Sequence, residues 1–326
     1  MSMQRTQQAE HLTAERGEQA LFCENVDRLV KLYEAAHQGR ASAQLVMGHM
    51  YANGDGLPQD HAEALRWYRE AARQGLAEAQ YRLAALYLEQ PARDIQSAFG
   101  WLLQAADQGH ARAQTELGML LADEPEYHDD TRALFWFNQA AAQGDALARD
   151  LVGTMHFYGR GTARNAEQAL SWWTLAAGQG YIPAQLKLGS LLSEGRGIAQ
   201  DDEAAARWYR LAAEQGHPLA QNNLGGLYLQ GRGVTQDASE AARWFSEAAY
   251  AGQLTAQFNL ASLFASGEGV CLDAIEACAW FSLAAEQGHS DAMMRRDALL
   301  MRLNDQQQLQ VKQRLFALTQ RHRHYH

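Results

Sequence analysis

Apolar residues follow a helical pattern along most of the chain. Ala, Leu and Tyr recur at spacings of three and four residues, which places them on one face of a helix with 3.6 residues per turn. No run of alternating apolar and polar residues, which would favour a half-buried strand, competes with this pattern. The sequence therefore predicts an all-α protein.

The motif Ala-Ala-x-x-Gly recurs along the chain and sets the period of an internal repeat. Its closing glycines are Gly39, Gly75, Gly109, Gly144, Gly180, Gly216, Gly252 and Gly288. Successive glycines lie 34 to 36 residues apart, so seven complete repeats fill residues 40–288. A period of this length is typical of solenoids, in which each repeat stacks on its neighbours.

Each repeat carries start and stop signals for two helices. The first helix is expected to end at a glycine such as Gly195 or Gly231, because glycine adopts the left-handed conformation at little cost. The second helix is expected to begin at a capping box, as at Asp60 with Glu63, where two backbone N–H groups gain partners. The sequence therefore predicts a helix-turn-helix unit in every repeat.

Seven of the eight tryptophans occupy one position of the repeat. They are Trp67, Trp101, Trp136, Trp172, Trp208, Trp244 and Trp280. A row of tryptophans could form a platform for a cofactor or a sugar. One tryptophan per repeat is more typical of a packing anchor between neighbouring repeats. On this interpretation, Trp208→Ala and Trp244→Ala should both lower the stability sharply.

Further positions repeat when they are counted from the closing glycine of the preceding repeat. Gln recurs at plus five, Leu-Gly at plus eight and nine, and an aromatic or aliphatic residue at plus twelve, as residues 216–252 show best. Together with the Gly-x-Gly turn and the tryptophan, this pattern resembles the Sel1-like repeat family over residues 40–288. The resemblance implies a right-handed α/α superhelical solenoid of about seven helix-turn-helix repeats, related to tetratricopeptide repeats, that serves as a protein-interaction scaffold.

The segments outside the repeats read as caps and tails. We expect a polar N-terminal tail at residues 1–17, a capping helix at 18–39, and C-terminal capping helices with a tail at 289–326. Asn304 is expected to cap a last amphipathic helix. The apolar residues of that helix are Leu309, Val311, Leu315 and Leu318. His322, His324 and His326 could bind a metal adventitiously, but a solvated tail is the simpler interpretation.

Composition and charge narrow the classes of partner. The formal net charge is −10, which argues against a nucleic-acid or anionic-membrane binder, because such partners need a basic surface. No stretch is long and apolar enough to span a bilayer, and the N-terminus has no signal-peptide core. Three cysteines are too few for a disulfide framework. The sequence thus predicts a cytoplasmic protein without membrane insertion.

No motif for catalysis, cofactor binding or metal binding is present. Phosphate-binding glycine loops, H-E-x-x-H and G-x-S-x-G are all missing, and Cys271 and Cys278 lack the spacing of a zinc site. The sequence predicts a non-catalytic scaffold, without cofactor or metal, for a protein or peptide partner whose identity it does not give. Two alternatives stay open: a hydrolase with an unrecognised site in the groove, and a self-assembling architectural protein whose oligomeric state the sequence does not indicate.

Positions plus six and plus seven are expected to face the concave groove, by analogy with tetratricopeptide solenoids. They vary among the repeats, as residues that read a ligand would, although unconstrained solvent positions vary too. An asparagine amide can donate to and accept from a peptide backbone, and aromatic side chains can anchor a partner. The candidate groove residues are Tyr81, Asn222, Asn223, Phe258 and Asn259.

A second candidate surface is a row of arginines. Arg160, Arg196 and Arg232 stand between the two glycines of the Gly-x-Gly turn in three successive repeats. Stacked repeats would align the three guanidinium groups as a strip that pairs with carboxylates or phosphates of a partner. The alternative is an ordinary solvated turn.

Overall fold

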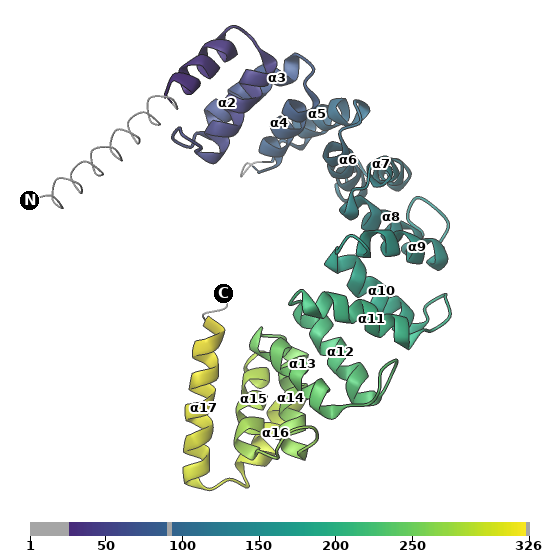
Figure 1. Ribbon diagram of the computed structural model, residues 1–326, viewed down its shortest axis with the longest axis vertical. Helices are drawn as coiled ribbons and strands as arrows, with labels where there is room; N and C mark the ends of the chain where they lie inside the picture. The colour runs from purple at the N-terminus through teal and green to yellow at the C-terminus, as the bar shows by residue number, and fades with distance from the viewer. Residues whose placement is uncertain (1–25, 90–92, 324–326) are drawn as a thin grey trace, which may run out of the picture. The chain divides into compact units, whose positions relative to one another are not determined.

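The computed structural model describes residues 26–89 and 93–323, and every regular element within these ranges is a helix (Figure 1). The predicted tail at residues 1–17 lies outside the described residues, as does the start of the predicted capping helix. The rest of that helix is present at residues 26–37. The chain forms two compact units, which we call unit 1 (residues 1–145) and unit 2 (residues 146–326).

The described part of unit 1 contains the helix at residues 26–37 and three helix pairs. The pairs are α2 (Ala41–Asn53) with α3 (His61–Arg73), α4 (Ala77–Glu89) with α5 (Ile95–Asp107), and α6 (Ala111–Asp123) with α7 (Asp130–Ala142). Within the unit, the first helix of each later pair packs on the second helix of its own pair and on that of the preceding pair.

Unit 2 continues the same arrangement. Its repeat pairs are α8 (Ala146–Tyr158) with α9 (Ala166–Ala177), α10 (Ile182–Glu194) with α11 (Asp202–Glu214), α12 (Pro218–Gln230) with α13 (Ala238–Tyr250), and α14 (Leu254–Ser266) with α15 (Ala274–Glu286). Two further helices, α16 (Ser290–Leu300) and α17 (Asp305–Arg323), follow the last repeat. The predicted all-α solenoid of helix-turn-helix repeats is confirmed.

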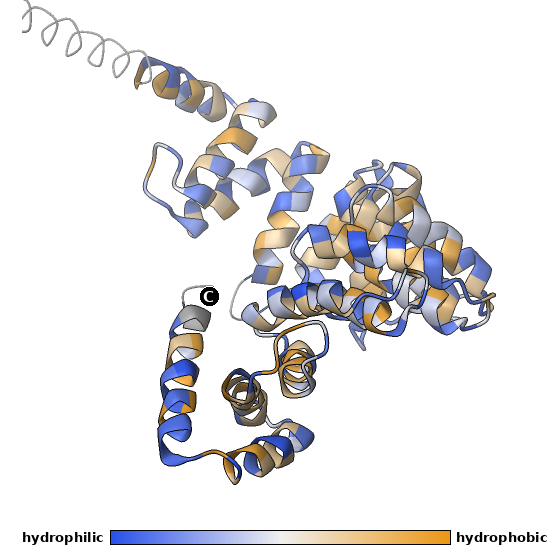
Figure 2. Ribbon diagram, turned by 60° about the horizontal axis from the view of Figure 1, so that its bottom comes forward, coloured by the Kyte–Doolittle hydropathy of each residue, from blue (hydrophilic) through white to orange (hydrophobic). Residues whose placement is uncertain are grey.

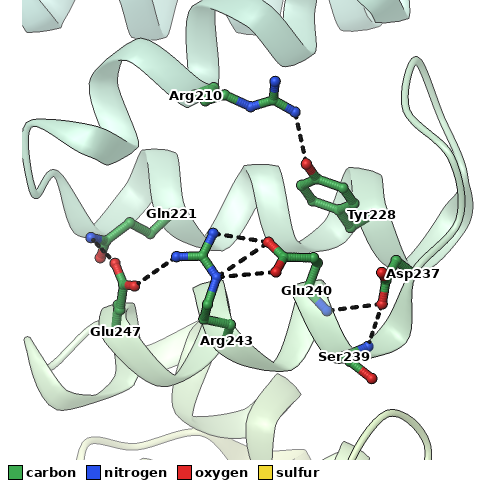
Figure 3. A network of polar contacts seen from close by, with 8 residues as sticks. All are labelled: Arg210, Gln221, Tyr228, Asp237, Ser239, Glu240, Arg243 and Glu247. Carbon is green, nitrogen blue, oxygen red and sulfur yellow. Dashed lines mark hydrogen bonds and ion pairs between the residues drawn. The ribbon is translucent and has the colours of Figure 1, made fainter.

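The helix ends are where the sequence signals place them. Gly195 and Gly231 end α10 and α12 with φ values of 64° and 68°, in the left-handed region that glycine tolerates. The carboxylate of Asp237 accepts hydrogen bonds from the N–H groups of Ser239 and Glu240 at the start of α13 (Figure 3). Because these ends are defined locally, each helix presents a fixed face to its neighbours.

The glycine at plus nine lets the two helices of a repeat approach closely. A Cβ atom added at Gly118 would lie 2.5 Å from the ring of Phe137, which is buried on the second helix of the same repeat. Gly48, Gly153, Gly189 and Gly225 face an aromatic ring in the same way. In the second repeat Ala84 holds this position and the smaller Leu102 holds the position of the ring. In the seventh repeat Ala261 stands at plus nine with Phe281 at the position of the ring, so the position holds a small residue throughout, glycine in five repeats and alanine in two.

Two adjacent glycines of α12 provide a test. Gly225→Ala would place its Cβ 2.8 Å from the ring of Phe245 and 3.2 Å from the carbonyl oxygen of Ala241, whereas nothing lies within 4 Å at Gly226. We expect Gly225→Ala to lower the free energy of unfolding by ~1–3 kcal/mol through overpacking. Gly226→Ala should raise it by ~0.5–1 kcal/mol, because alanine costs less backbone entropy in a helix. Urea unfolding followed by circular dichroism measures both, and equal effects would contradict the packing role.

The tryptophan position joins neighbouring repeats. Trp67, Trp136, Trp244 and Trp280 are buried, which confirms the packing anchor for these four. The ring of Trp280 packs edge-on against Tyr250 on the preceding second helix, with centroids 5.1 Å apart. Trp101, Trp172 and Trp208 are partly exposed. The burial of Trp244 fits the expectation that Trp244→Ala lowers the stability sharply, whereas the partial exposure of Trp208 favours a smaller effect of Trp208→Ala.

Buried glutamines at position plus five, which we call the glutamine ladder, link neighbouring helices through hydrogen bonds. The Nε2 of Gln44 donates to the carbonyl of Ala36 (3.1 Å), and its Oε1 accepts from Gln74 (2.7 Å). Gln80, Gln114, Gln185 and Gln257 make the same two contacts in their repeats.

The sixth repeat departs from this ladder. Ala251 stands where the second glutamine would be, and the Nε2 of Gln221 donates instead to Glu247 (3.1 Å). Glu247 also pairs with Arg243, so a charged network takes the place of the amide pair (Figure 3). The Oε1 of Gln221 is left buried without a partner among the described residues.

The last helix caps unit 2. Asn304 forms the expected capping box, because its Oδ1 accepts from the N–H of Gln307 at 2.9 Å. α17 packs along α15, and residues of both hydrophilic and hydrophobic kinds follow one another along it (Figures 1 and 2). Val311 and Leu318 are buried as expected. Leu309 is 55% exposed, since it lies on nearly the opposite side of the helix from Val311, and its assignment to the apolar face is wrong.

Candidate functional site

Three of the predicted groove residues meet in a depression of unit 2. The depression has a volume of about 370 Å³ and lies mainly between the first helices α10 and α12. Asn222 and Asn223 of α12 line it, together with Asn259 of α14. The buried ring of Tyr209 from α11 also lines it. The structure thus brings these three amides together.

The three amides form a chain of hydrogen bonds. The Nδ2 of Asn259 donates to the Oδ1 of Asn222 (3.0 Å), and the Nδ2 of Asn222 donates to the Oδ1 of Asn223 (3.3 Å). Burial raises the pKa of Tyr209 to about 12, although hydrogen bonds with Asn223 and Ser190 lower it in part. The phenol therefore stays protonated at neutral pH, and the lining offers neutral donors and acceptors.

Arg232 also lines this depression, but its charge is already paired. Its Nε and Nη2 contact the carboxylate of Asp202 at 3.1 and 2.7 Å, and Nη2 also donates to the carbonyl of Ser193 at 2.8 Å. The hydrogen bond from Arg232 is the main reason why the pKa of Asp202 is lowered. This arginine joins the turn after α12 to α10 and α11, a structural role that the sequence analysis did not anticipate.

The other two arginines of the row stand in the corresponding turns of unit 2. Arg196 is exposed and pairs with Glu194, the last residue of α10. Arg160 occupies the same place in the turn after α8. The charges of Arg196 and Arg232 are thus balanced by carboxylates of the chain itself.

Tyr81 and Phe258 line neither this depression of unit 2 nor the corresponding depression of unit 1 between α2 and α4. Tyr81, in unit 1, stacks on His110 with ring centroids 4.9 Å apart, and Phe258, in unit 2, stacks on His289 at 4.4 Å. Each of these histidines follows the closing glycine of the same repeat and caps the next helix through its Nδ1. Position plus six therefore packs repeats together at Tyr81 and Phe258, whereas Asn222 at the same position lines the depression of unit 2.

A second depression, of about 350 Å³, lies between α2 and α4 in unit 1. Its lining matches that of the first by repeat position, because His49 corresponds to Ser190 and Tyr68 to Tyr209. Arg82 stands at plus seven, in the place that Asn223 holds in unit 2. The same backbone framework thus carries ionisable groups in unit 1 and mostly neutral ones in unit 2.

Positions plus ten and plus fourteen were missed by the sequence analysis. They contribute His49 and Asn53 in unit 1, and Ser190 and Glu194 in unit 2. Both positions vary among the repeats, just as plus six and plus seven do. That variation was a usable signal, because plus seven, ten and fourteen lie one helical turn apart on one face.

Electrostatics in the unit 1 depression are set by burial and by one ion pair. Burial lowers the pKa of His49, and the charge of Arg82 lowers it further, so this imidazole is neutral at pH 7. Arg82 donates from Nε to Glu78 at 2.6 Å. Burial raises the pKa of Glu78, but hydrogen bonds from His110 and Arg82 outweigh this and lower it overall.

Three other chemical features concern the described residues, namely metal ligands, membrane-spanning helices and cysteines. No cluster of three or more His, Cys, Asp or Glu side chains suited to a metal is found among them. No helix in this part of the chain has the length and apolar character needed to cross a membrane. Cys271 is exposed and Cys278 is buried, both as free thiols, and burial raises the pKa of Cys278 to about 11. Cys23, His324 and His326 lie outside the described residues.

Comparison with known proteins identifies the repeat. The family model "Sel1 repeat" matches residues 41–76, 77–110, 111–145, 146–181, 182–217, 218–253 and 254–289. None of the curated proteins matches closely enough to assign a function by relatedness.

Two solved structures are similar over most of the chain. A Sel1 repeat protein from Oxalobacter formigenes is 36% identical, with a TM-score of 0.70 over 82% of this chain and 79% of that one. The protein c5321, described as a protective antigen of uropathogenic Escherichia coli with an SLR fold, is 28% identical. Its TM-score is 0.65 over 90% of this chain and 71% of that one.

Proposed function

Because this chain belongs to the Sel1 repeat family, we propose that it is a non-catalytic scaffold that binds a protein or peptide partner. The repeats supply a rigid framework, and side chains that vary from repeat to repeat face the depressions between first helices. A framework of this kind suits recognition of an extended segment. We further propose a cytoplasmic location, which the free thiols of Cys271 and Cys278 support.

The observation that carries this proposal is the amide chain of unit 2. Asn222, Asn223 and Asn259 line one depression, and each amide retains hydrogen-bonding capacity beyond the bonds within the chain. A peptide backbone presents alternating donors and acceptors, which such amides can pair with whatever the side chains of the peptide are. We place the contact at these amides and not at the arginine row, because Arg232 already forms an ion pair with Asp202.

The double variant Asn223→Ala, Asn259→Ala tests this site. A partner is first captured from the native host and identified by mass spectrometry, and its affinity is then measured with purified proteins. We expect the variant to bind it at least about tenfold more weakly, since two or more hydrogen bonds worth ~0.5–1.5 kcal/mol each are lost. The variant should keep a helical circular dichroism spectrum, with a lower melting temperature because Asn223 is also a hydrogen-bond partner of the buried hydroxyl of Tyr209.

Gln313→Ala is the matched control, because it removes an exposed amide from α17, away from the depression. Its affinity should equal that of the parent. If the double variant also binds like the parent, the partner does not use the amide chain.

Polar groups around the same depression support a binding role more than catalysis. Tyr209 is protonated at neutral pH, and Glu194 is engaged by Arg196 and by the hydroxyl of Ser190. A general base needs an available group with a pKa near the working pH. The hydrolase alternative therefore lacks support from these residues.

Self-association through the C-terminal cap is a second candidate function. Met294 is 65% exposed, Met301 87% and Phe316 66%, and large exposed apolar side chains mark contact surfaces when they gather. Sedimentation velocity over a range of concentrations measures the association directly. Loss of any dimer in Met301→Ser, Phe316→Ser would assign it to this cap, and a monomer at all concentrations would reject the candidate.

A further inference from the structure

The unit 1 depression holds more negative than positive charge. Asp55 and Glu89 line it, and neither carboxylate has a cationic partner among the described residues. The one arginine of the lining, Arg82, is neutralised by Glu78 at 2.6 Å. His49 is neutral at pH 7. Two negative charges are therefore left uncompensated around this space.

Two further polar groups line the same depression without protein partners. Tyr68 is only 2% exposed, and its hydroxyl makes no hydrogen bond within the described part of the chain. The Nε2 of His49 is buried and has no partner in that part either. The two rings pack edge-on, with centroids 5.5 Å apart. Unpaired polar groups of buried side chains are costly, which makes them unusual in a finished core.

In the equivalent depression of unit 2, the corresponding polar groups have partners within the protein. There the hydroxyl of Tyr209 is hydrogen-bonded to Asn223 and Ser190. Glu194 pairs with Arg196, and Arg232 pairs with Asp202. The repeat framework therefore does not itself require unpaired groups at this place, and their presence in unit 1 is particular to its side chains.

We propose that the unit 1 depression binds a positively charged side chain, the guanidinium of an arginine or the ammonium of a lysine, presented by a partner protein. The carboxylates of Asp55 and Glu89 supply the opposite charge. The phenol oxygen of Tyr68 can accept a hydrogen bond, and the neutral imidazole of His49 adds no opposing positive charge. Guanidinium and ammonium groups are pure donors, so they match a space lined by acceptors. This site shares no residue with the amide chain of unit 2 and does not depend on it.

The positive charge of Arg82 does not make this depression a binding site for anions. Its Nε donates to Glu78, and its guanidinium lies 5.5 Å from the ring centroid of Tyr81. Asp55 accepts a hydrogen bond from Asn53 at 3.2 Å, but neither it nor Glu89 has a cationic partner among the described residues, so both would repel an incoming carboxylate. The balance of charge thus favours a cation.

Titration of the full-length chain with N-acetyl-arginine amide tests the proposal. Histidines labelled with ¹³C at Cε1 are observed by NMR, and the His49 resonance is assigned with His49→Gln. We expect this resonance to shift in a saturable manner. N-acetyl-citrulline amide, which has the same shape without the charge, should produce almost no shift.

Two pairs of charge variants test whether the arginine derivative binds at this depression or merely to the negative charge of the protein surface. Asp55→Asn, Glu89→Gln should weaken binding of the arginine derivative at least about tenfold, because both opposing charges are lost. Asp107→Asn, Glu126→Gln makes the same change of net charge at exposed positions of unit 1 and should bind like the parent. Equal weakening by the two pairs would overturn the proposal.

Two tyrosine variants separate a role in binding from a role in stability. Tyr68→Phe removes a hydroxyl that has no protein partner, so the melting temperature should hold while affinity for the arginine derivative falls. Tyr209→Phe removes a hydrogen-bonded hydroxyl and should lower the melting temperature while arginine binding stays the same. The proposal fails if citrulline shifts His49 as much as arginine does, or if Tyr68→Phe binds like the parent.

Discussion

Replacing Lys187 with Met is expected to lower the free energy of unfolding by about 3 kcal/mol, because a buried carboxylate is left without its counterion. That carboxylate belongs to Asp150, which is 3% exposed. The Nζ of Lys187 lies 2.7 Å from its Oδ2 and also donates to Thr154 at 2.9 Å. The pair connects α8 to α10 and so joins two successive repeats of unit 2.

The stability lost in Lys187→Met should be larger at pH 7 than at pH 5. Burial raises the pKa of Asp150, and the charge and hydrogen bond of Lys187 oppose that rise. A carboxyl group whose pKa is higher in the folded state than in the unfolded state favours folding at low pH, and this contribution is lost as pH rises. Lys187→Met removes the opposing influence. The variant should therefore recover stability as pH is lowered from 7 towards 5, relative to the parent.

A double variant provides the control. Leu occupies the position of Asp150 in two other repeats, as Leu45 and Leu186. Asp150→Leu, Lys187→Met therefore replaces the ion pair with apolar side chains that the fold already accepts there, and should be near the stability of the parent. Urea unfolding at pH 5 and 7 measures all three proteins. A single variant as stable as the double one would show that Asp150 does not need Lys187.

This pair illustrates which parts of the fold the sequence could predict. The closing glycines, the capping boxes and the glycine stops act locally, so each could be recognised from a few neighbouring residues. Asp150 and Lys187 are 37 residues apart, and only the stacking of α8 on its neighbours brings them together. From the sequence they are two polar residues at variable positions of the repeat. Their pairing depends on the tertiary structure.

The candidate site was predicted in part for the same reason. Of the residues expected in a groove at plus six and plus seven, Asn222, Asn223 and Asn259 line one depression. Phe258 was expected in the same groove but does not line the depression, because the histidine after the closing glycine stacks on its ring. Nor did the sequence indicate that Arg232 would reach back to Asp202 in the preceding repeat. Such contacts depend on side-chain length and the spacing between repeats, which a motif does not encode.

Trp280→Ala is expected to produce a loss of similar or greater size, ~3–5 kcal/mol in the free energy of unfolding. Trp280 is 1% exposed and lies in a large apolar cluster of unit 2, where Phe281 and Leu318 are also fully buried. Its removal would leave a cavity between repeats, since it contacts Tyr250 of α13 as well as its own repeat. Surrounding side chains on two sides would lose packing contacts.

Trp208→Ala is the matched comparison, because it makes the same change at the same repeat position. Trp208 is partly exposed, so less apolar surface returns to water and the space it leaves is open to solvent. We expect less than about half the loss found for Trp280→Ala. Circular dichroism in urea is the suitable measurement, because it does not rely on the fluorescence of the tryptophan that is removed. If Trp208→Ala is as destabilising as Trp280→Ala, burial at this position does not determine how strongly each repeat is anchored to its neighbour.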